Sequence, residues 1–169
     1  MELETKVLSR ELQQRMYDNG LTIGTAESCT GGRVAEAIIA TPGASKYFKG
    51  GVICYSNELK ENLLGVSAQV LAEQSAVSEE VAIQMVKGAC ETLKTDYTVA
   101  VTGYAGPVAG ENDGVPVGTI WVACGTKDNT LTLKLNEDFG RDINLAIATN
   151  RALRLMLDFL EQEKGAAAE

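Results

Sequence analysis

Residues 97–102 read YTVAVT, and this short run of small and β-branched side chains decides the fold class. A nearly continuous apolar strand of this kind is typical of a parallel sheet that is covered on both faces. Helical and strand patterns alternate through the sequence around it. The chain is therefore predicted to form an α/β fold, a three-layer α/β/α sandwich built on a mixed, mostly parallel sheet.

The flanking sequence predicts five helices and four further strands. Val7, Leu8, Leu12 and Met16 fall on one face of the first helix. The last two strands are separated by a polar turn and are expected to form an antiparallel hairpin. One domain is expected over residues 1–164, with a frayed tail at residues 165–169. The expected helices cover residues 4–19, 33–40, 58–64, 79–94 and 142–163, and the expected strands cover residues 21–26, 51–55, 97–102, 118–124 and 130–135.

The composition argues against several classes of function. The 169 residues carry a formal charge of −8 and include no histidine, which excludes a Ser-His-Asp triad and any imidazole metal ligand. The sequence pI of about 4.7 argues against a nucleic-acid surface. The four cysteines are isolated, without metal-ligand spacing. No apolar run is long enough to span a membrane and the N-terminus has no signal-peptide pattern, so we expect a cytoplasmic protein with no membrane partner.

Three loops rich in glycine or hydroxyl groups follow predicted strands, at residues 25–32, 55–60 and 102–107. In an open α/β sheet, ligands bind at the carboxyl ends of the strands, where such loops gather. The sequence therefore places a candidate binding site at this edge. The arrangement is common in α/β domains, so it does not by itself identify the ligand.

Each candidate residue in these loops has a functional and an ordinary interpretation. The N–H groups of Gly31 and Gly32 could bind an oxyanion at a helix N-terminus, or they could belong to a capped turn. Lys60 could be a base with a pKa lowered by burial and by the helix dipole, or a solvated lysine. Arg141, just before the last helix, could bind a phosphate or face solvent. These alternatives stay open on the pattern alone.

Six segments of the sequence form a specific pattern: TAESCTGG (25–32), GGVICYSNELK (50–60), LLGV (63–66), AVSEEV (76–81), TGYAGP (102–107) and PVGT (116–119). Taken together, they resemble the C-terminal domain of the competence-damage-inducible protein CinA, a family that includes stand-alone nicotinamide-nucleotide amidases. The resemblance implies a three-layer α/β/α fold. It also implies hydrolysis of nicotinamide mononucleotide to nicotinic acid mononucleotide and ammonia, without a metal or an organic cofactor.

The resemblance also implies a role for each site residue. Ser28 would be the nucleophile, Lys60 its base and Tyr55 an assisting group, with the oxyanion held near Gly31 and Gly32. The phosphate would bind to Arg141 and the loop at residues 102–106. The expected substrate-binding residues are Thr30, Gly31, Gly32, Thr102, Gly103, Ala105, Gly106 and Arg141.

Two segments depart from the family pattern. Residues 139–141 read FGR where the family has Gly-Asp-Arg, and residues 107–114 read PVAGENDG where the family has a run of glycines. Both lie in expected substrate-binding elements and leave Ser28 and Lys60 in place. The primary hypothesis is a deamidase, and the alternative is a catalytically weak nucleotide-binding or regulatory module. The oligomeric state, a homo-oligomer included, stays open.

Overall fold

The computed structural model describes residues 2–108 and 114–168. The third loop's departure from the family pattern falls largely on residues 109–113, which lie outside the described residues. Five strands form one mixed sheet in the order β2-β1-β3-β4-β5. They are β1 (Ile23–Glu27), β2 (Phe48–Ile53), β3 (Tyr97–Gly103), β4 (Thr119–Gly125) and β5 (Thr130–Asn136).

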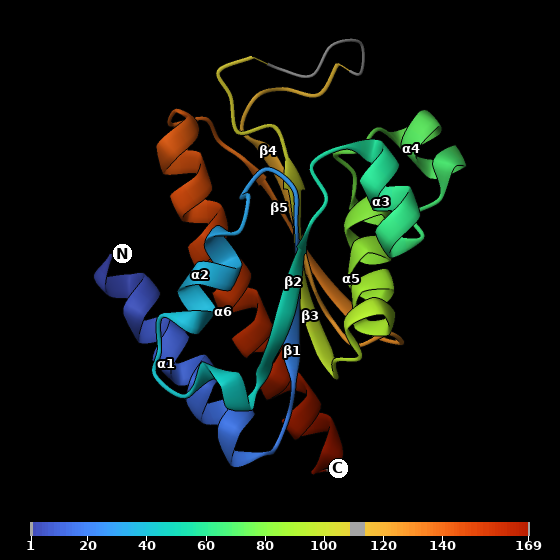
Figure 1. The fold of residues 1–169 in the computed structure, drawn as a ribbon. Helices are drawn as coiled ribbons and strands as arrows, with labels where there is room; N and C mark the ends of the chain where they lie inside the picture. Colours follow the sequence, from blue (N-terminus) through green and yellow to red (C-terminus); the bar gives the residue numbers. More distant parts are fainter. Residues whose placement is uncertain (1, 109–113, 169) are drawn as a thin grey trace.

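Helices cover both faces of this sheet (Figure 1). On one face lie α1 (Leu3–Asp18), α2 (Arg33–Ile39) and α6 (Arg141–Ala167), and on the other lie α3 (Asn57–Leu64), α4 (Ala68–Gln74) and α5 (Glu79–Leu93). A 3-10 turn, Ala44–Lys46, precedes β2. Helix α6 is longer than predicted and continues through the small residues of the C-terminal tail to Ala167. None of the described helices has the length and apolar character needed to cross a membrane.

The sheet is mixed as predicted, but the expectation that it is mostly parallel is wrong. β1 pairs in parallel with β2 and β3, whereas β3–β4 and β4–β5 are antiparallel. The predicted hairpin is confirmed as β4–β5. The chain reaches β4 from β3 through a loop that returns at the same edge of the sheet, which requires an antiparallel pair. A parallel pair would need a crossover to the opposite edge.

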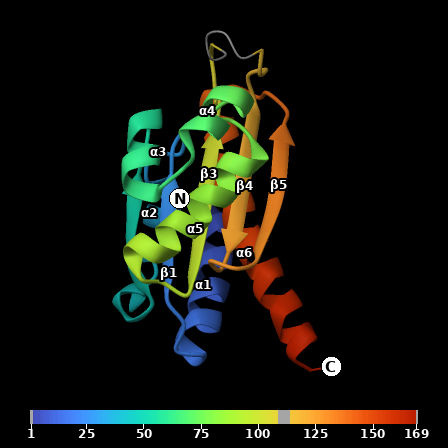
Figure 2. The same cartoon turned by 90° about the vertical axis from the view of Figure 1, so that its right-hand side faces the viewer.

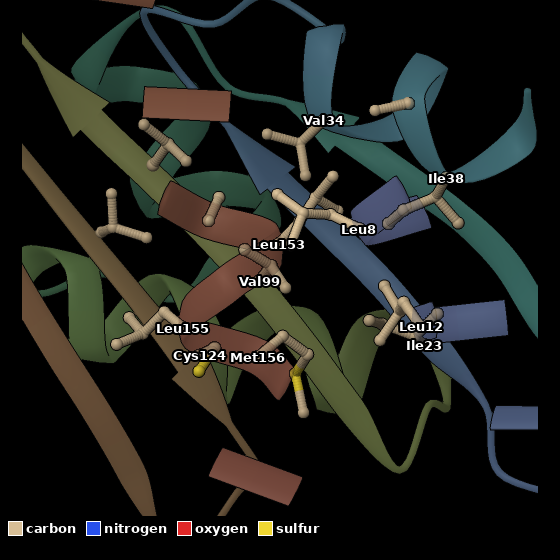
Figure 3. Close-up of a cluster of buried hydrophobic side chains, with 14 of the residues drawn as sticks. Leu8, Leu12, Ile23, Val34, Ile38, Val99, Cys124, Leu153, Leu155 and Met156 are labelled. Carbon is tan, nitrogen blue, oxygen red and sulfur yellow. The ribbon is translucent and has the colours of Figure 1, made fainter. Parts of the chain in front are cut away.

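The face under α1 and α6 holds the larger core (Figure 3). Leu8 and Leu12 of α1 are fully buried beside Leu153 and Met156 of α6. Each such side chain stabilises the fold by roughly 1.5–3 kcal/mol. The prediction that Val7 belongs to this face is wrong, because Val7 is 54% exposed.

The opposite face is covered mainly by α5, which crosses the sheet in front of β3 and β4 (Figure 2). Ser78 caps α5 by accepting a hydrogen bond from the N–H of Val81. Helix α3 lies against α5 at Gly88, where an added Cβ would collide with the backbone of Leu64. This close approach holds α3, and with it Lys60, against the body of the domain.

Candidate active site

Ser28 lies at the turn that directly follows β1. Its N–H donates to the carbonyl of Val101 in β3 at 2.9 Å, and its carbonyl accepts from the N–H of Gly31 at 3.1 Å. Gly31 and Gly32 have φ values of 59° and 104°, which side-chain-bearing residues rarely adopt. The tight turn thus fixes the backbone of Ser28 at the carboxyl edge of the sheet.

Lys60 reaches this turn from the neighbouring helix. Its Nζ lies 3.1 Å from Oγ of Ser28 and 2.8 Å from the carbonyl oxygen of Cys54, and the residue is only 1% exposed. Helix α3 begins after Ser56, whose hydroxyl accepts from the N–H of Leu59, and this cap sets the position of Lys60 one turn later. The structure therefore brings together the two residues expected to act as nucleophile and base.

The surroundings of Lys60 favour its neutral form. Burial lowers the pKa of Lys60 from its ordinary value, and the Cys54 and Cys29 thiols oppose this shift. Within the described part of the chain, no carboxylate lies within 4.0 Å of its amine. A neutral amine has a lone pair that can accept the Ser28 proton, as a general base requires.

Ser28 and Lys60 line a cavity of about 700 Å³. Most of the residues expected at the site lie on its wall: Ser28, Tyr55, Lys60, Thr102, Gly103, Ala105, Gly106 and Arg141. Thr30, Gly31 and Gly32 do not line it. The Tyr55 side chain is 63% exposed, whereas Thr30 is buried with a hydroxyl that has no hydrogen-bond partner among the described residues.

The N-terminus of α2 is occupied by the side chain of Glu27. The carboxylate, 1% exposed, accepts from the N–H groups of Gly32 at 3.2 Å, Val34 at 2.9 Å and Ala35 at 3.0 Å. A buried carboxylate is stable there because the helix dipole and the free N–H groups compensate its charge. The N–H of Gly31 is also used within the turn. The expectation that the Gly31 and Gly32 amides bind an oxyanion is therefore not met by this geometry.

Other amides in the turn remain available instead. Among the described residues, the N–H of Thr30 has no hydrogen-bond acceptor, and the N–H of Cys29 has only the thiol of its own residue. The amide that follows a nucleophile is a common oxyanion donor in serine hydrolases. Burial raises the pKa of the Cys29 thiol to about 12, which makes this cysteine a poor nucleophile despite its place on the cavity wall.

Arg141 also lines this cavity. Its guanidinium donates to the carbonyl of Gly106 at 2.8 Å, which ties the start of α6 to the third loop. The next residue in the sequence, Asp142, forms an ion pair with Arg33 at 3.6 Å. The hydroxyl of Thr102 donates a hydrogen bond to the carbonyl of Ala76 at 2.8 Å, which joins the start of the third loop to residues 75–77.

One wall of the cavity was not expected from the sequence. It is formed by the end of α4 and residues 75–77, where Leu71 is the one buried side chain of that short helix. A helix with a single buried apolar residue gives no periodic signal. The hydroxyl of Ser67, which caps α4 by accepting from the N–H of Val70 at 3.4 Å, is the signal that could have revealed it.

Within the described residues, no three histidine, cysteine, aspartate or glutamate side chains lie close enough to hold a metal ion. The groups on the wall of this cavity include a buried hydroxyl, a buried amine, backbone amides and the guanidinium of Arg141, together with the carboxylate of Glu73. Such a set can attack and hydrolyse an acyl compound that carries an anionic group.

The sequence is similar to those of known proteins over most of its length. The sequence model of the CinA C-terminal domain matches residues 5–160. The chain belongs to the CinA C-terminal domain family. Nicotinamide-nucleotide amidohydrolase PncC of Escherichia coli K12 is 43% identical to this CinA-family chain over 123 residues, which cover 73% of the chain and 74% of PncC.

Two further relatives show how the family varies in length. Protein YdeJ of Escherichia coli K12 is 39% identical over 153 residues, covering 90% of the chain and 88% of YdeJ. A CinA-like protein of Shewanella piezotolerans is 38% identical over 158 residues, which are 90% of this chain and 37% of that longer protein.

Solved structures of the family share this fold. A CinA superfamily protein from Escherichia coli has a TM-score of 0.88 at 37% identity, with 93% of this chain and 91% of that chain covered. The competence/damage inducible protein CihA of Agrobacterium tumefaciens has a TM-score of 0.88 at 34% identity, with coverage of 95% and 99%.

Proposed function

We propose that this CinA-family protein is an amidohydrolase that converts nicotinamide mononucleotide and water into nicotinic acid mononucleotide and ammonia. The observation that carries the proposal is the buried pair of Ser28 and Lys60, with Oγ and Nζ 3.1 Å apart on the wall of one cavity. The 43% identity to a nicotinamide-nucleotide amidohydrolase supports the choice of substrate.

The first half of the reaction forms a tetrahedral intermediate on Ser28. Neutral Lys60 takes the hydroxyl proton as Oγ attacks the carboxamide carbon. The carbonyl oxygen becomes an oxyanion, and the N–H of Cys29 is the donor best placed by sequence to stabilise it. The carbonyl of Cys54, 2.8 Å from Nζ, holds the resulting ammonium in place.

The second half releases both products. The proton on Lys60 is transferred to the departing nitrogen, directly or through Tyr55, and the C–N bond breaks to give ammonia. A water molecule then attacks the ester left on Ser28 while Lys60 accepts a proton from it, and Lys60 returns this proton to Oγ of Ser28 as the ester C–O bond breaks. The acid product and free Ser28 result, and the protons and electrons balance without a redox partner or metal.

The nucleotide phosphate is bound by Arg141 and the third loop. Arg141 presents a permanent positive charge there, next to Ala105 and Gly106 of the third loop. Guanidinium groups and free backbone amides are typical phosphate ligands. Binding of the phosphate there would hold the substrate in the cavity that Ser28 and Lys60 also line.

The test is incubation with nicotinamide mononucleotide, with ammonia and nicotinic acid mononucleotide both quantified. The proposal predicts that the two products appear in equal amounts. Tight mononucleotide binding without turnover in the folded protein would contradict the deamidase and support the nucleotide-binding module.

A further inference from the structure

The third loop is held from behind by a buried asparagine of α6, Asn144. This residue is 3% exposed, and its Nδ2 donates to the carbonyl of Ala105 at 3.0 Å and to Asp138 at 2.9 Å. Its Oδ1 accepts from the N–H of Phe139 at 2.9 Å. Asn144 thus joins the third loop to the segment that leads into α6.

These contacts determine which way the loop amides point. In a planar trans peptide the carbonyl and the following N–H point in opposite directions. The carbonyl of Ala105 points to Asn144, so the N–H of Gly106 points away from α6. The carbonyl of Tyr104 accepts from Gly118 at 2.8 Å, so the N–H of Ala105 points away from Gly118.

Both amides are free to bind a ligand. Ala105 and Gly106 line the cavity, and within the described ranges their N–H groups have no hydrogen-bond acceptor. Arg141, one turn before Asn144 on the same helix, donates to the carbonyl of Gly106 at 2.8 Å. Two residues with free amides and one guanidinium therefore lie on the wall of the same cavity, and the contact between Arg141 and Gly106 holds them together.

We infer that Asn144 is a positioning residue for an anion site composed of the Ala105 and Gly106 amides and Arg141. The inference rests on the proposed function for the identity of the anion, the phosphate of a mononucleotide, and it adds the residue that orients the site. Because Asn144 does not line the cavity that contains Ser28, it acts on the anion only through the loop.

Asn150 supplies a matched control on the same helix. It is also a buried asparagine, 8% exposed, and it accepts from Thr5 at 2.6 Å and donates to Glu4 at 3.2 Å. Its contacts join α6 to α1 and do not involve the third loop. Replacing either asparagine by alanine removes buried hydrogen bonds of α6. A loss of phosphate affinity that came only from a weakened fold would therefore appear in both variants.

The experiment is a titration with inorganic phosphate, followed through the NMR signals of the Ala105 and Gly106 amides. Phosphate is expected to shift both signals in the parent protein and, with equal affinity, in Asn150→Ala. In Asn144→Ala the affinity for phosphate is expected to fall at least about 10-fold. This is the scale of one hydrogen bond between a loop amide and the phosphate, which is lost when Asn144 no longer holds the loop. If the alanine variant does not fold, Asn144→Leu is titrated in its place. Leucine fills the space of the side chain without a hydrogen-bond donor, and the same loss of phosphate affinity is expected.

The inference is overturned if phosphate leaves both amide signals of the parent unchanged, or if the Asn144 variants bind phosphate as well as the parent does. Turnover of nicotinamide mononucleotide is measured separately. With turnover, Asn144→Ala is expected to raise KM and leave kcat within about twofold. Absence of turnover together with the expected phosphate shifts would refute the proposed reaction but not the anion site.

Discussion

The amine of Lys60 is 3.1 Å from the hydroxyl oxygen of Ser28, and both residues are buried at the carboxyl edge of the sheet. The same burial that makes this contact possible also lowers the pKa of Lys60. The lysine can therefore be neutral at a pH where an exposed lysine is charged. This relationship makes a histidine-free hydrolase chemically reasonable.

The first prediction concerns the pH dependence of the reaction. The active form needs neutral Lys60, so kcat/KM should rise with pH as Lys60 loses its proton, and this rise should be centred below the ordinary lysine pKa of 10.5. The measurement is the initial rate of ammonia release from nicotinamide mononucleotide across pH. A rate that falls with rising pH, in a range where circular dichroism shows an intact fold, would contradict a lysine base.

The second prediction concerns Arg141. Arg141→Gln should weaken mononucleotide binding by roughly 1.5–3 kcal/mol, because it removes a charge-assisted hydrogen bond to the phosphate. It should barely change the affinity for the riboside, which has no phosphate. Titration calorimetry in a Ser28→Ala background separates binding from turnover.

The control for this change is Arg151→Gln, an exposed arginine further along α6 that does not line the cavity of Ser28. It should bind both ligands as the parent does. Equal losses of nucleotide and riboside affinity in Arg141→Gln would remove Arg141 from the phosphate site.

The third prediction concerns Glu27. Glu27→Gln keeps the shape of the side chain but replaces one carboxylate oxygen, an acceptor, by an NH2 group, a donor. One N–H at the start of α2 is then left without an acceptor. The free energy of unfolding should fall by roughly 1–3 kcal/mol, the cost of such a buried group. The measurement is urea denaturation, with Glu36→Gln as the control because Glu36 is exposed in the same helix. Similar unfolding midpoints for Glu27→Gln and the parent would show that the carboxylate contributes little.

The fourth prediction concerns metals. The proposed steps use only Ser28, Lys60, Tyr55, backbone amides and Arg141, so exhaustive treatment with a chelator should leave the rate of ammonia release unchanged. Activity that disappears on chelation and returns with added zinc or magnesium would contradict the mechanism.

Much of the fold follows from local sequence signals. The run at residues 97–102 forms the buried strand β3, and the turn at residues 126–129 joins β4 and β5 as expected. The balance of parallel and antiparallel pairs was misjudged because it depends on where the chain re-enters the sheet after the third loop. The sequence did not predict helix α4, because a helix with one buried side chain shows no repeating hydrophobic pattern.

The site was predictable only in part. The motif around Ser28 and the motif around Lys60 identify the pair, but residues 57–64 read NELKENLL, which has the pattern of a solvated helix. The burial of Lys60 arises from the packing of α3 on α5 and has no local signal. The roles of Glu27 and Asn144 likewise depend on backbone groups brought near by the tertiary fold.

The central claim is that Ser28 and Lys60 together hydrolyse the amide, and the most direct measurement is ammonia release from nicotinamide mononucleotide by matched variants. Ser28→Ala and Lys60→Met should each reduce turnover by at least about 100-fold, while remaining folded. Lys87→Met, which changes an exposed lysine of α5, should retain the parent rate. Near-parental turnover by folded Lys60→Met, or the absence of turnover in the parent protein itself, would contradict the account.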